Sequence, residues 1–136
     1  MTLKDDYQRI AHRSLNASES LLQAGIQEKA TFMTYHAFES TGCALSESCG
    51  LTVGPKVHHT TKLEKFKQAT QRVGHYHRRV ASLAFRLGNL RNSMLYPNLD
   101  RQNNTIKRPE NAITLKDARE LKGHVEGIVN WVDQKI

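Results

Sequence analysis

Apolar residues recur every three or four positions along most of this chain, which is the spacing of amphipathic helices. The first such stretch runs from Leu3 to Leu22 and should end near Gly25, and the second runs from about Gln27 to Gly50. The second stretch is rich in small residues, so a neighbouring helix can approach it closely. No segment alternates with the period of two expected for a strand, and the pattern therefore predicts an all-α fold.

A third apolar stretch, from about Thr60 to Leu95, is too long for one helix in a chain of this size. At 1.5 Å per residue it would span roughly 54 Å, so we expect a break near Gly74 that leaves a short helix followed by a longer one. Pro97 ends the longer helix. Tyr96 should already lie outside it, because the residue before a proline avoids helical backbone angles.

The last helix is predicted from Thr114 to the end of the chain. Thr114 and Asp117 repeat the spacing of Thr2 and Asp5 at the start of the first helix. In this arrangement, a capping box, a threonine oxygen and a carboxylate three residues later satisfy backbone N–H groups that the helix leaves free.

Together these stretches predict a single helical domain over residues 1–136, an up-and-down four-helix bundle with one extra short helix. The segment at about 97–113 is longer than most connections in a compact domain, so we expect a flexible basic loop there. Bundles of this size often keep an apolar strip uncovered, which favours a homodimer.

No apolar run approaches the eighteen or so residues of a membrane span, and the first six residues are acidic where a signal peptide would be basic. We therefore expect a cytoplasmic protein without a membrane anchor. Cys43 and Cys49 lie six positions apart, on different faces of their helix, and are expected to be free thiols.

Positive charge is concentrated in the middle of the chain. Residues 56–108 hold twelve Lys or Arg against two acids, a net +10, whereas residues 1–55 carry −2 and residues 109–136 carry −1. Such a segment attracts phosphate groups, although it could also be a solvated basic face that only aids solubility.

The motifs of common enzyme classes are missing: the chain has no phosphate-binding glycine loop, no His-Glu-x-x-His and no serine in a tight glycine turn. The seven histidines do not have the spacing of metal ligands; His75 and His77, for example, diverge on a helix. We expect neither a metal nor a cofactor.

Two segments carry a resemblance to a known family. Ala24-Gly-Ile-Gln-Glu-Lys-Ala30, followed by Tyr35-His-Ala-Phe-Glu39 and then by His58 or His59, resembles the first half of the HEPN domain. Arg91-Asn-Ser-Met-Leu-Tyr96 stands where that family has an arginine followed, after a short spacer, by a histidine. The resemblance covers roughly residues 7–133.

The resemblance implies a four-helix bundle that acts on or binds RNA. Members with an intact arginine and histidine are metal-independent endoribonucleases that act as toxins or defence effectors, often as dimers, and many are paired with a small nucleotidyltransferase. Members that have lost the pair bind RNA or nucleotides without cleaving them.

Tyr96 occupies the position of the family histidine. Tyrosine titrates near pH 10 and is a poor general base, although it can donate a hydrogen bond or stack on a base. Arg91 still has the planar fork that suits a phosphate. Arg91 and Tyr96 are therefore the candidate catalytic residues. The candidate RNA- or nucleotide-binding residues are Arg91, Asn92, Arg86, Arg79 and Glu39.

Three hypotheses follow. The leading one is a HEPN-like RNA- or nucleotide-binding module with weak or no catalysis, part of a toxin–antitoxin or defence pair. The second is an active ribonuclease that uses Arg91 and Tyr96 with a supporting histidine, His75 or His77 being one route. The third is a helical adaptor whose basic face binds an acidic protein. Glu39 either pairs with a basic residue across the bundle or sets the charge near Arg91.

Overall fold

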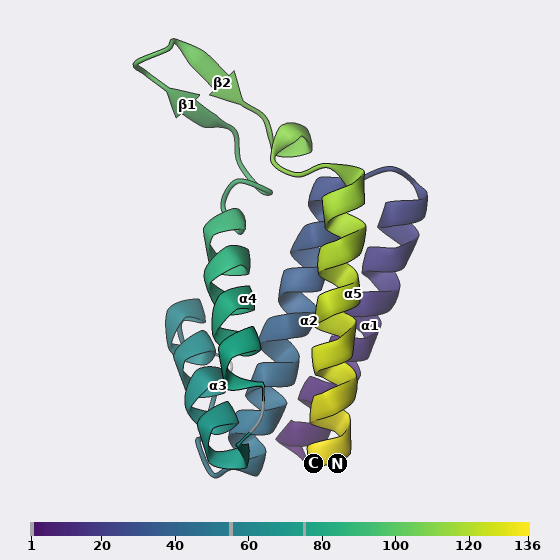
Figure 1. Ribbon diagram of the computed structural model, residues 1–136, viewed down its shortest axis with the longest axis vertical. Helices are drawn as coiled ribbons and strands as arrows, with labels where there is room; N and C mark the ends of the chain where they lie inside the picture. The colour runs from purple at the N-terminus through teal and green to yellow at the C-terminus, as the bar shows by residue number, and fades with distance from the viewer. Residues whose placement is uncertain (1, 55, 75) are drawn as a thin grey trace.

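The computed structural model of the chain describes residues 2–54, 56–74 and 76–136. These residues form five α-helices, and a small hairpin with a short 3-10 helix separates the last two (Figure 1). The elements in chain order are α1 (Leu3–Gln23), α2 (Gln27–Ser48), α3 (His59–Val73), α4 (His77–Leu90), β1 (Asn98–Asp100), β2 (Thr105–Lys107), η1 (Pro109–Asn111) and α5 (Leu115–Lys135). The all-α prediction is confirmed.

Helix α2 lies at the centre and packs against α1, α3 and α5. Helices α1, α2, α4 and α5 alternate in direction, as predicted for an up-and-down bundle (Figure 1). Helix α3 is the extra helix and runs parallel to α2. His59, at its start, is bonded to Glu39, whereas Arg72, near its end, donates to the Cys49 carbonyl at 2.7 Å. The connection between α2 and α3 therefore runs back along α2.

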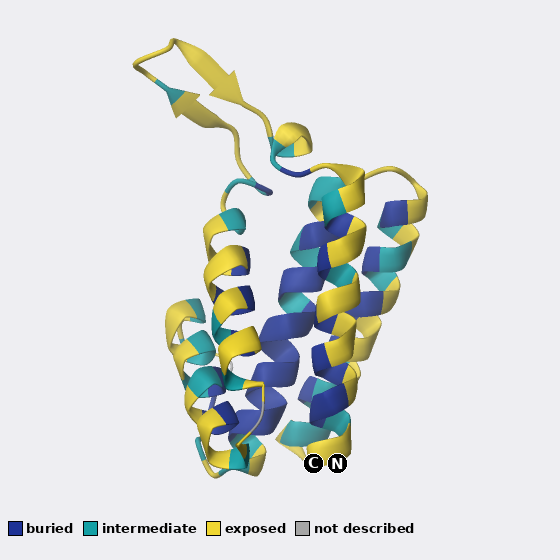
Figure 2. Cartoon of the chain, in the orientation of Figure 1, coloured by how far each residue is buried: buried dark blue, intermediate teal, exposed yellow. Residues whose placement is uncertain are grey.

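The second half of α2 is buried on nearly every side, which explains its run of small residues (Figure 2). Gly42 faces the ring of Phe66 on α3 so closely that a methyl group at this position would overlap the ring. The small side chains thus let α3 approach the α2 backbone, as the sequence pattern predicts.

The predicted helix starts and the predicted break are confirmed. Thr2 Oγ1 accepts a hydrogen bond from the Asp5 N–H at 3.2 Å, and Asp5 Oδ2 accepts one from the Thr2 N–H at 3.0 Å. Thr114 Oγ1 accepts from the Asp117 N–H at 3.1 Å. Helix α3 ends at Val73, and its C-cap Gly74 has a φ of 84°, a left-handed conformation that glycine adopts without strain.

The predicted end of α4 is wrong. The helix ends at Leu90 rather than Leu95, and α3 and α4 have 15 and 14 residues rather than being one short and one longer helix. Hydrogen-bonded turns follow, in which the Tyr96 N–H donates to the Asn92 carbonyl at 3.0 Å. These turns place Met94 in the core, fully buried, and Tyr96 lies outside the helix as expected.

The segment predicted as a loop contains regular structure. Strands β1 and β2 pair antiparallel, with Leu99 opposite Ile106. Strands of three residues are too short to show alternation in the sequence, so the pattern could not predict them.

The cysteines are free, as predicted, with Cys43 buried and Cys49 half-buried. Burial raises the pKa of the Cys43 thiol to about 12. Within the described ranges, no helix combines the length and the apolar character needed to cross a bilayer.

Candidate functional site

A buried carboxylate on α2 organises the site. Glu39 is only 4% exposed, and a charge in such a position needs partners to offset its loss of water. The Tyr35 hydroxyl, one turn earlier on the same face of α2, donates to Glu39 Oε2 at 2.6 Å. Lys62 Nζ on α3 lies 3.6 Å from Oε1, and His59 Nδ1 lies 2.8 Å from Oε2. Four side chains from two helices therefore form one polar cluster.

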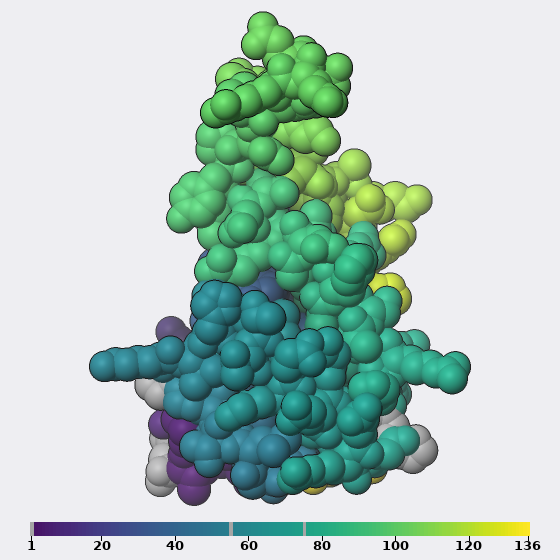
Figure 3. Space-filling model, turned by 90° about the vertical axis from the view of Figure 1, so that its left-hand side faces the viewer, coloured from purple at the N-terminus to yellow at the C-terminus, as the bar shows by residue number. Residues whose placement is uncertain are grey.

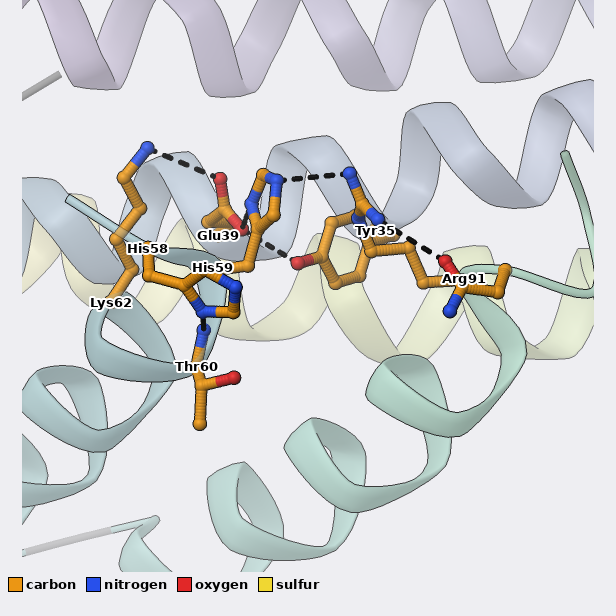
Figure 4. A network of polar contacts seen from close by, with 8 residues as sticks. Tyr35, Glu39, His58, His59, Thr60, Lys62 and Arg91 are labelled. Carbon is orange, nitrogen blue, oxygen red and sulfur yellow. Dashed lines mark hydrogen bonds and ion pairs between the residues drawn. The ribbon is translucent and has the colours of Figure 1, made fainter. Parts of the chain in front are cut away.

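His59 links this cluster to Arg91. Its Nε2 lies 2.9 Å from Arg91 Nη2, and its Nδ1 faces Glu39 (Figure 4). A guanidinium can only donate hydrogen bonds, so His59 Nε2 must be the acceptor. The imidazole proton is then on Nδ1, where it is donated to Glu39. In this arrangement His59 is neutral and oriented by a carboxylate on one side and a cation on the other.

The preceding residue helps to position His59. His58 is the N-cap of α3, and its ring nitrogen accepts a hydrogen bond from the Thr60 N–H at 3.2 Å. The cap fixes the first turn of the helix, and with it the place of His59 beside Glu39.

Arg91 packs against two aromatic rings, but not all of its guanidinium N–H groups have hydrogen-bond partners among the described residues. It is the C-cap of α4, and its guanidinium carbon lies 6.0 Å and 5.9 Å from the ring centres of Phe32 and Tyr35. Nη1 donates to Asn92 Oδ1 at 3.3 Å, whereas the buried Nε has no hydrogen-bond partner among the described residues. A buried donor without a partner typically costs about 1–3 kcal/mol. Nε is covered in this arrangement, so a ligand could offer it an acceptor only if the Arg91 side chain turned outward.

The cluster has a net positive charge. Lys62 offsets Glu39, His59 is neutral, and Arg91 adds one positive charge. Burial, followed by the hydrogen bond to Glu39, raises the pKa of Tyr35 above its ordinary value, so Tyr35 remains a neutral donor. The net charge of the cluster therefore favours the approach of an anion.

The structure brings together only some of the predicted site residues. Glu39 and Arg91 belong to one network through His59, and Asn92 contacts Arg91. Glu39 therefore pairs with a basic residue of another helix, Lys62, and is linked to Arg91 through His59. Tyr96 is 64% exposed; its backbone N–H bonds to the Asn92 carbonyl, but its side chain makes no hydrogen bond with the network among the described residues.

Arg79 and Arg86 lie elsewhere on α4. Both are exposed and line a groove with His124 of α5, so the structure does not bring them to Arg91. His77 is bonded to Thr70 at 3.1 Å, at the opposite end of α4 from Arg91. His75, the other histidine considered as a supporting group, lies outside the described residues.

The sequence analysis did not name Tyr35 or Lys62 as site residues, and it did not decide which of His58 and His59 belongs to the site. The signal was present in the spacing. Tyr35 and Glu39 are four apart on one helix, and His59 and Lys62 are three apart on another, so each pair shares a face. No group of three His, Cys, Asp or Glu with metal-binding geometry occurs within residues 2–54, 56–74 and 76–136.

Comparison with known proteins supplies the family. Residues 5–135, nearly the whole chain, match the HEPN domain. No curated protein and no solved structure matches the chain. The family match spans every helix of the bundle, and the chain belongs to the HEPN domain family.

Proposed function

We propose that this HEPN domain is an RNA- or nucleotide-binding module in which Arg91 holds a phosphate group. The observation that carries this proposal is the Arg91 guanidinium itself: a partly buried cation that contacts a neutral histidine and has an unpartnered buried Nε among the described residues. A phosphate oxygen can accept from two guanidinium N–H groups at once, and such charge-assisted bonds are stronger than neutral ones.

The surrounding charge supports the same ligand. Residues 56–108 carry a net +10, and the cluster around Glu39 adds no excess negative charge. A field of this sign raises the local concentration of nucleic acid and speeds its association.

Binding is tested with fluorescently labelled single-stranded RNA at several salt concentrations. We expect affinity to fall steeply with salt, and Arg91→Ala to weaken binding roughly tenfold or more, because a charge-assisted hydrogen bond is worth about 1.5–3 kcal/mol. Arg78→Ala is the matched control: it removes the same charge from an exposed position at the other end of α4 and should change affinity about twofold at most.

Equal losses for both variants would mean that the basic segment attracts RNA without a defined site. Absence of RNA binding, together with an acidic protein that co-purifies in equal amounts, would favour the adaptor hypothesis instead.

A second candidate function is metal-independent RNA cleavage, and the tautomer of His59 favours it. Glu39 holds the proton on Nδ1, which leaves Nε2 as the acceptor that a general base requires. In this reaction Nε2 takes the proton of a 2′-hydroxyl, the 2′-oxygen bonds to phosphorus, and the bond from phosphorus to the 5′-oxygen breaks. The leaving oxygen takes a proton from water, and Arg91 neutralises the phosphate.

Arg91 occupies Nε2 in the present arrangement, so the base is available only after Arg91 turns toward a phosphate. We therefore expect slow cleavage or none. Incubation with RNA and a chelator, beside His59→Ala and a substrate lacking the 2′-hydroxyl, decides between the two functions. Cleavage that disappears with either change supports the ribonuclease, whereas equal cleavage by wild type and His59→Ala indicates a contaminant.

Four wider assignments remain predictions. A small nucleotidyltransferase partner and a role in a toxin–antitoxin or defence pair come from the family resemblance, a homodimer comes from the resemblance and from the general tendency of small bundles to keep an apolar strip, and a cytoplasmic location comes from the sequence pattern. Size-exclusion chromatography with light scattering tests the homodimer, and co-expression with an adjacent nucleotidyltransferase gene tests the partner.

A further inference from the structure

The hairpin formed by β1 and β2 projects from the end of the helical bundle and is exposed along almost its whole length (Figure 2). Its turn is tied by Asp100. Oδ1 of that residue accepts from the N–H groups of Gln102 and Asn103 at 3.1 Å and 3.3 Å, and Oδ2 accepts from the Asn103 side chain at 2.9 Å. These hydrogen bonds, of which those from Asn103 have the largest effect, lower the pKa of the Asp100 carboxyl. The turn of the hairpin is therefore held by hydrogen bonds among residues 100–103.

The charges of the hairpin are mostly unpaired. Its one carboxylate, Asp100, is engaged in the turn, whereas Arg101, Lys107 and Arg108 are exposed and form no ion pair within the part of the chain that the structure describes. Three cations at the tip and base of a projecting ribbon give this end of the molecule a local positive potential.

A pocket of about 360 Å³ lies at the base of the hairpin. It has an apolar wall that includes Leu90, and its polar lining consists of neutral hydrogen-bonding groups and two cations, without any carboxylate. These polar residues are Ser93, Asn98, Lys107, Arg108 and Asn111. This lining suits an anion that also offers hydroxyl or carbonyl groups, as a nucleotide does.

The pocket adjoins the Arg91 site. Leu90 and Ser93 line the pocket and flank Arg91 and Asn92 in sequence. Because consecutive Cα atoms are 3.8 Å apart, the Cα atoms of Arg91 and Ser93 are separated by at most about 7.6 Å. The same turn therefore carries Arg91 and forms part of the pocket wall. Seen from the side of α3 and α4, the hairpin rises directly beyond this end of the helices (Figure 3).

Tyr96 lies on the chain between this turn and β1, with 64% of its surface exposed. Exposed aromatic rings beside a cationic surface stack on nucleobases, and stacking tolerates any base sequence.

We infer that the pocket at the base of the hairpin is a second phosphate subsite, so that the ligand is a single-stranded RNA of several nucleotides rather than a mononucleotide. One phosphate binds Arg91, the strand passes Tyr96, and a later phosphate binds Lys107 and Arg108. This inference rests on the proposed phosphate-binding role of Arg91.

The test compares RNA lengths in the full chain. Dissociation constants are measured by isothermal titration calorimetry for a dinucleotide and an eight-nucleotide RNA, with wild type, Lys107→Gln/Arg108→Gln and Arg91→Ala. The double variant should weaken the eight-nucleotide complex about tenfold and leave the dinucleotide within about twofold. The salt dependence of the eight-nucleotide complex should also be shallower by up to about 0.7 in slope, because each phosphate contact to a single strand contributes roughly 0.7.

The matched control is Lys29→Gln/Lys135→Gln, which removes two exposed charges from α2 and α5 and should leave both complexes within about twofold. An eight-nucleotide complex that the double hairpin variant does not weaken, while Arg91→Ala does, overturns the second subsite and leaves the proposed function standing. If Arg91→Ala weakens neither complex, or no RNA binds, the proposed function fails and the second subsite fails with it.

Discussion

At the scale of single residues, the site depends on a buried charge that is fully engaged. Glu39 accepts bonds from Tyr35 and His59 and pairs with Lys62, so its negative charge is compensated inside the bundle. Removing one partner of a buried ionic group typically costs about 3–5 kcal/mol, because the other charge stays buried alone. In this structure the contact with Glu39 leaves Nε2 of His59 facing Arg91.

His36, next to this cluster on α2, gives a prediction about pH. The pKa of His36 is lowered, mainly because the side chain is buried. The negative charge of Glu39 opposes this shift, and the positive charge of Lys62 adds to it. As pH falls below about 6.5, the unfolded chain therefore takes up a proton that the native chain does not, and the native state loses stability.

The variant His36→Gln cannot titrate, so its free energy of unfolding should fall less steeply than that of wild type between about pH 7 and pH 5. The difference in slope cannot exceed about 1.4 kcal/mol per pH unit for one proton. Urea unfolding at several pH values measures it. Parallel curves for the two proteins would show that His36 is not protected from protonation in the native state.

At the scale of helices, the parallel packing of α3 against α2 depends on Gly42. The ring of Phe66 occupies the space that a side chain at position 42 would need. Because the position is inside a helix and fully surrounded, the backbone and the ring cannot both stay in place if a methyl group is added.

We predict that Gly42→Ala destabilises the protein by about 1–2 kcal/mol: overpacking costs roughly 1–3 kcal/mol, and the better helix propensity of alanine returns up to about 1 kcal/mol. Gly123→Ala is the control, since nothing lies within 4 Å of the added methyl group on α5. It should stabilise by about 0.5–1 kcal/mol. Thermal or urea unfolding compares the two variants, and stabilisation of similar size in both would contradict the close packing of α3 on α2.

The elements that could be predicted are those with local signals. The capping pair Thr2 and Asp5, the glycine break at Gly74 and the 3.6-residue period each depend on neighbours in sequence. The end of α4 could not be predicted, because Met94 continues the helical pattern but reaches the core from a turn. His59 could not be separated from His58, because only the position of α3 decides which ring meets Glu39.

At the scale of the molecule, the charge pattern and the fold act together. The basic segment 56–108 contains α3, α4 and the hairpin, and the fold separates its cations into distinct groups. Arg91 is turned toward α2 and α3, Arg79 and Arg86 lie in a groove beside α5, and Lys107 and Arg108 lie at the base of the hairpin. The sequence predicts one basic segment, whereas the fold divides these cations among three separate places on the molecule.

The proposed phosphate-binding role of Arg91 can be tested directly at its Nε–Hε group by NMR. In a ¹H–¹⁵N NMR spectrum, the Nε–Hε signal of Arg91 is identified by its absence from the spectrum of Arg91→Lys. Titration with an eight-nucleotide single-stranded RNA should shift this signal progressively to saturation, because Arg91 turns toward the phosphate and its Nε gains an acceptor, while the signal of Arg78 moves little. An Arg91 signal that stays in place while RNA shifts backbone amides elsewhere would contradict the proposed site.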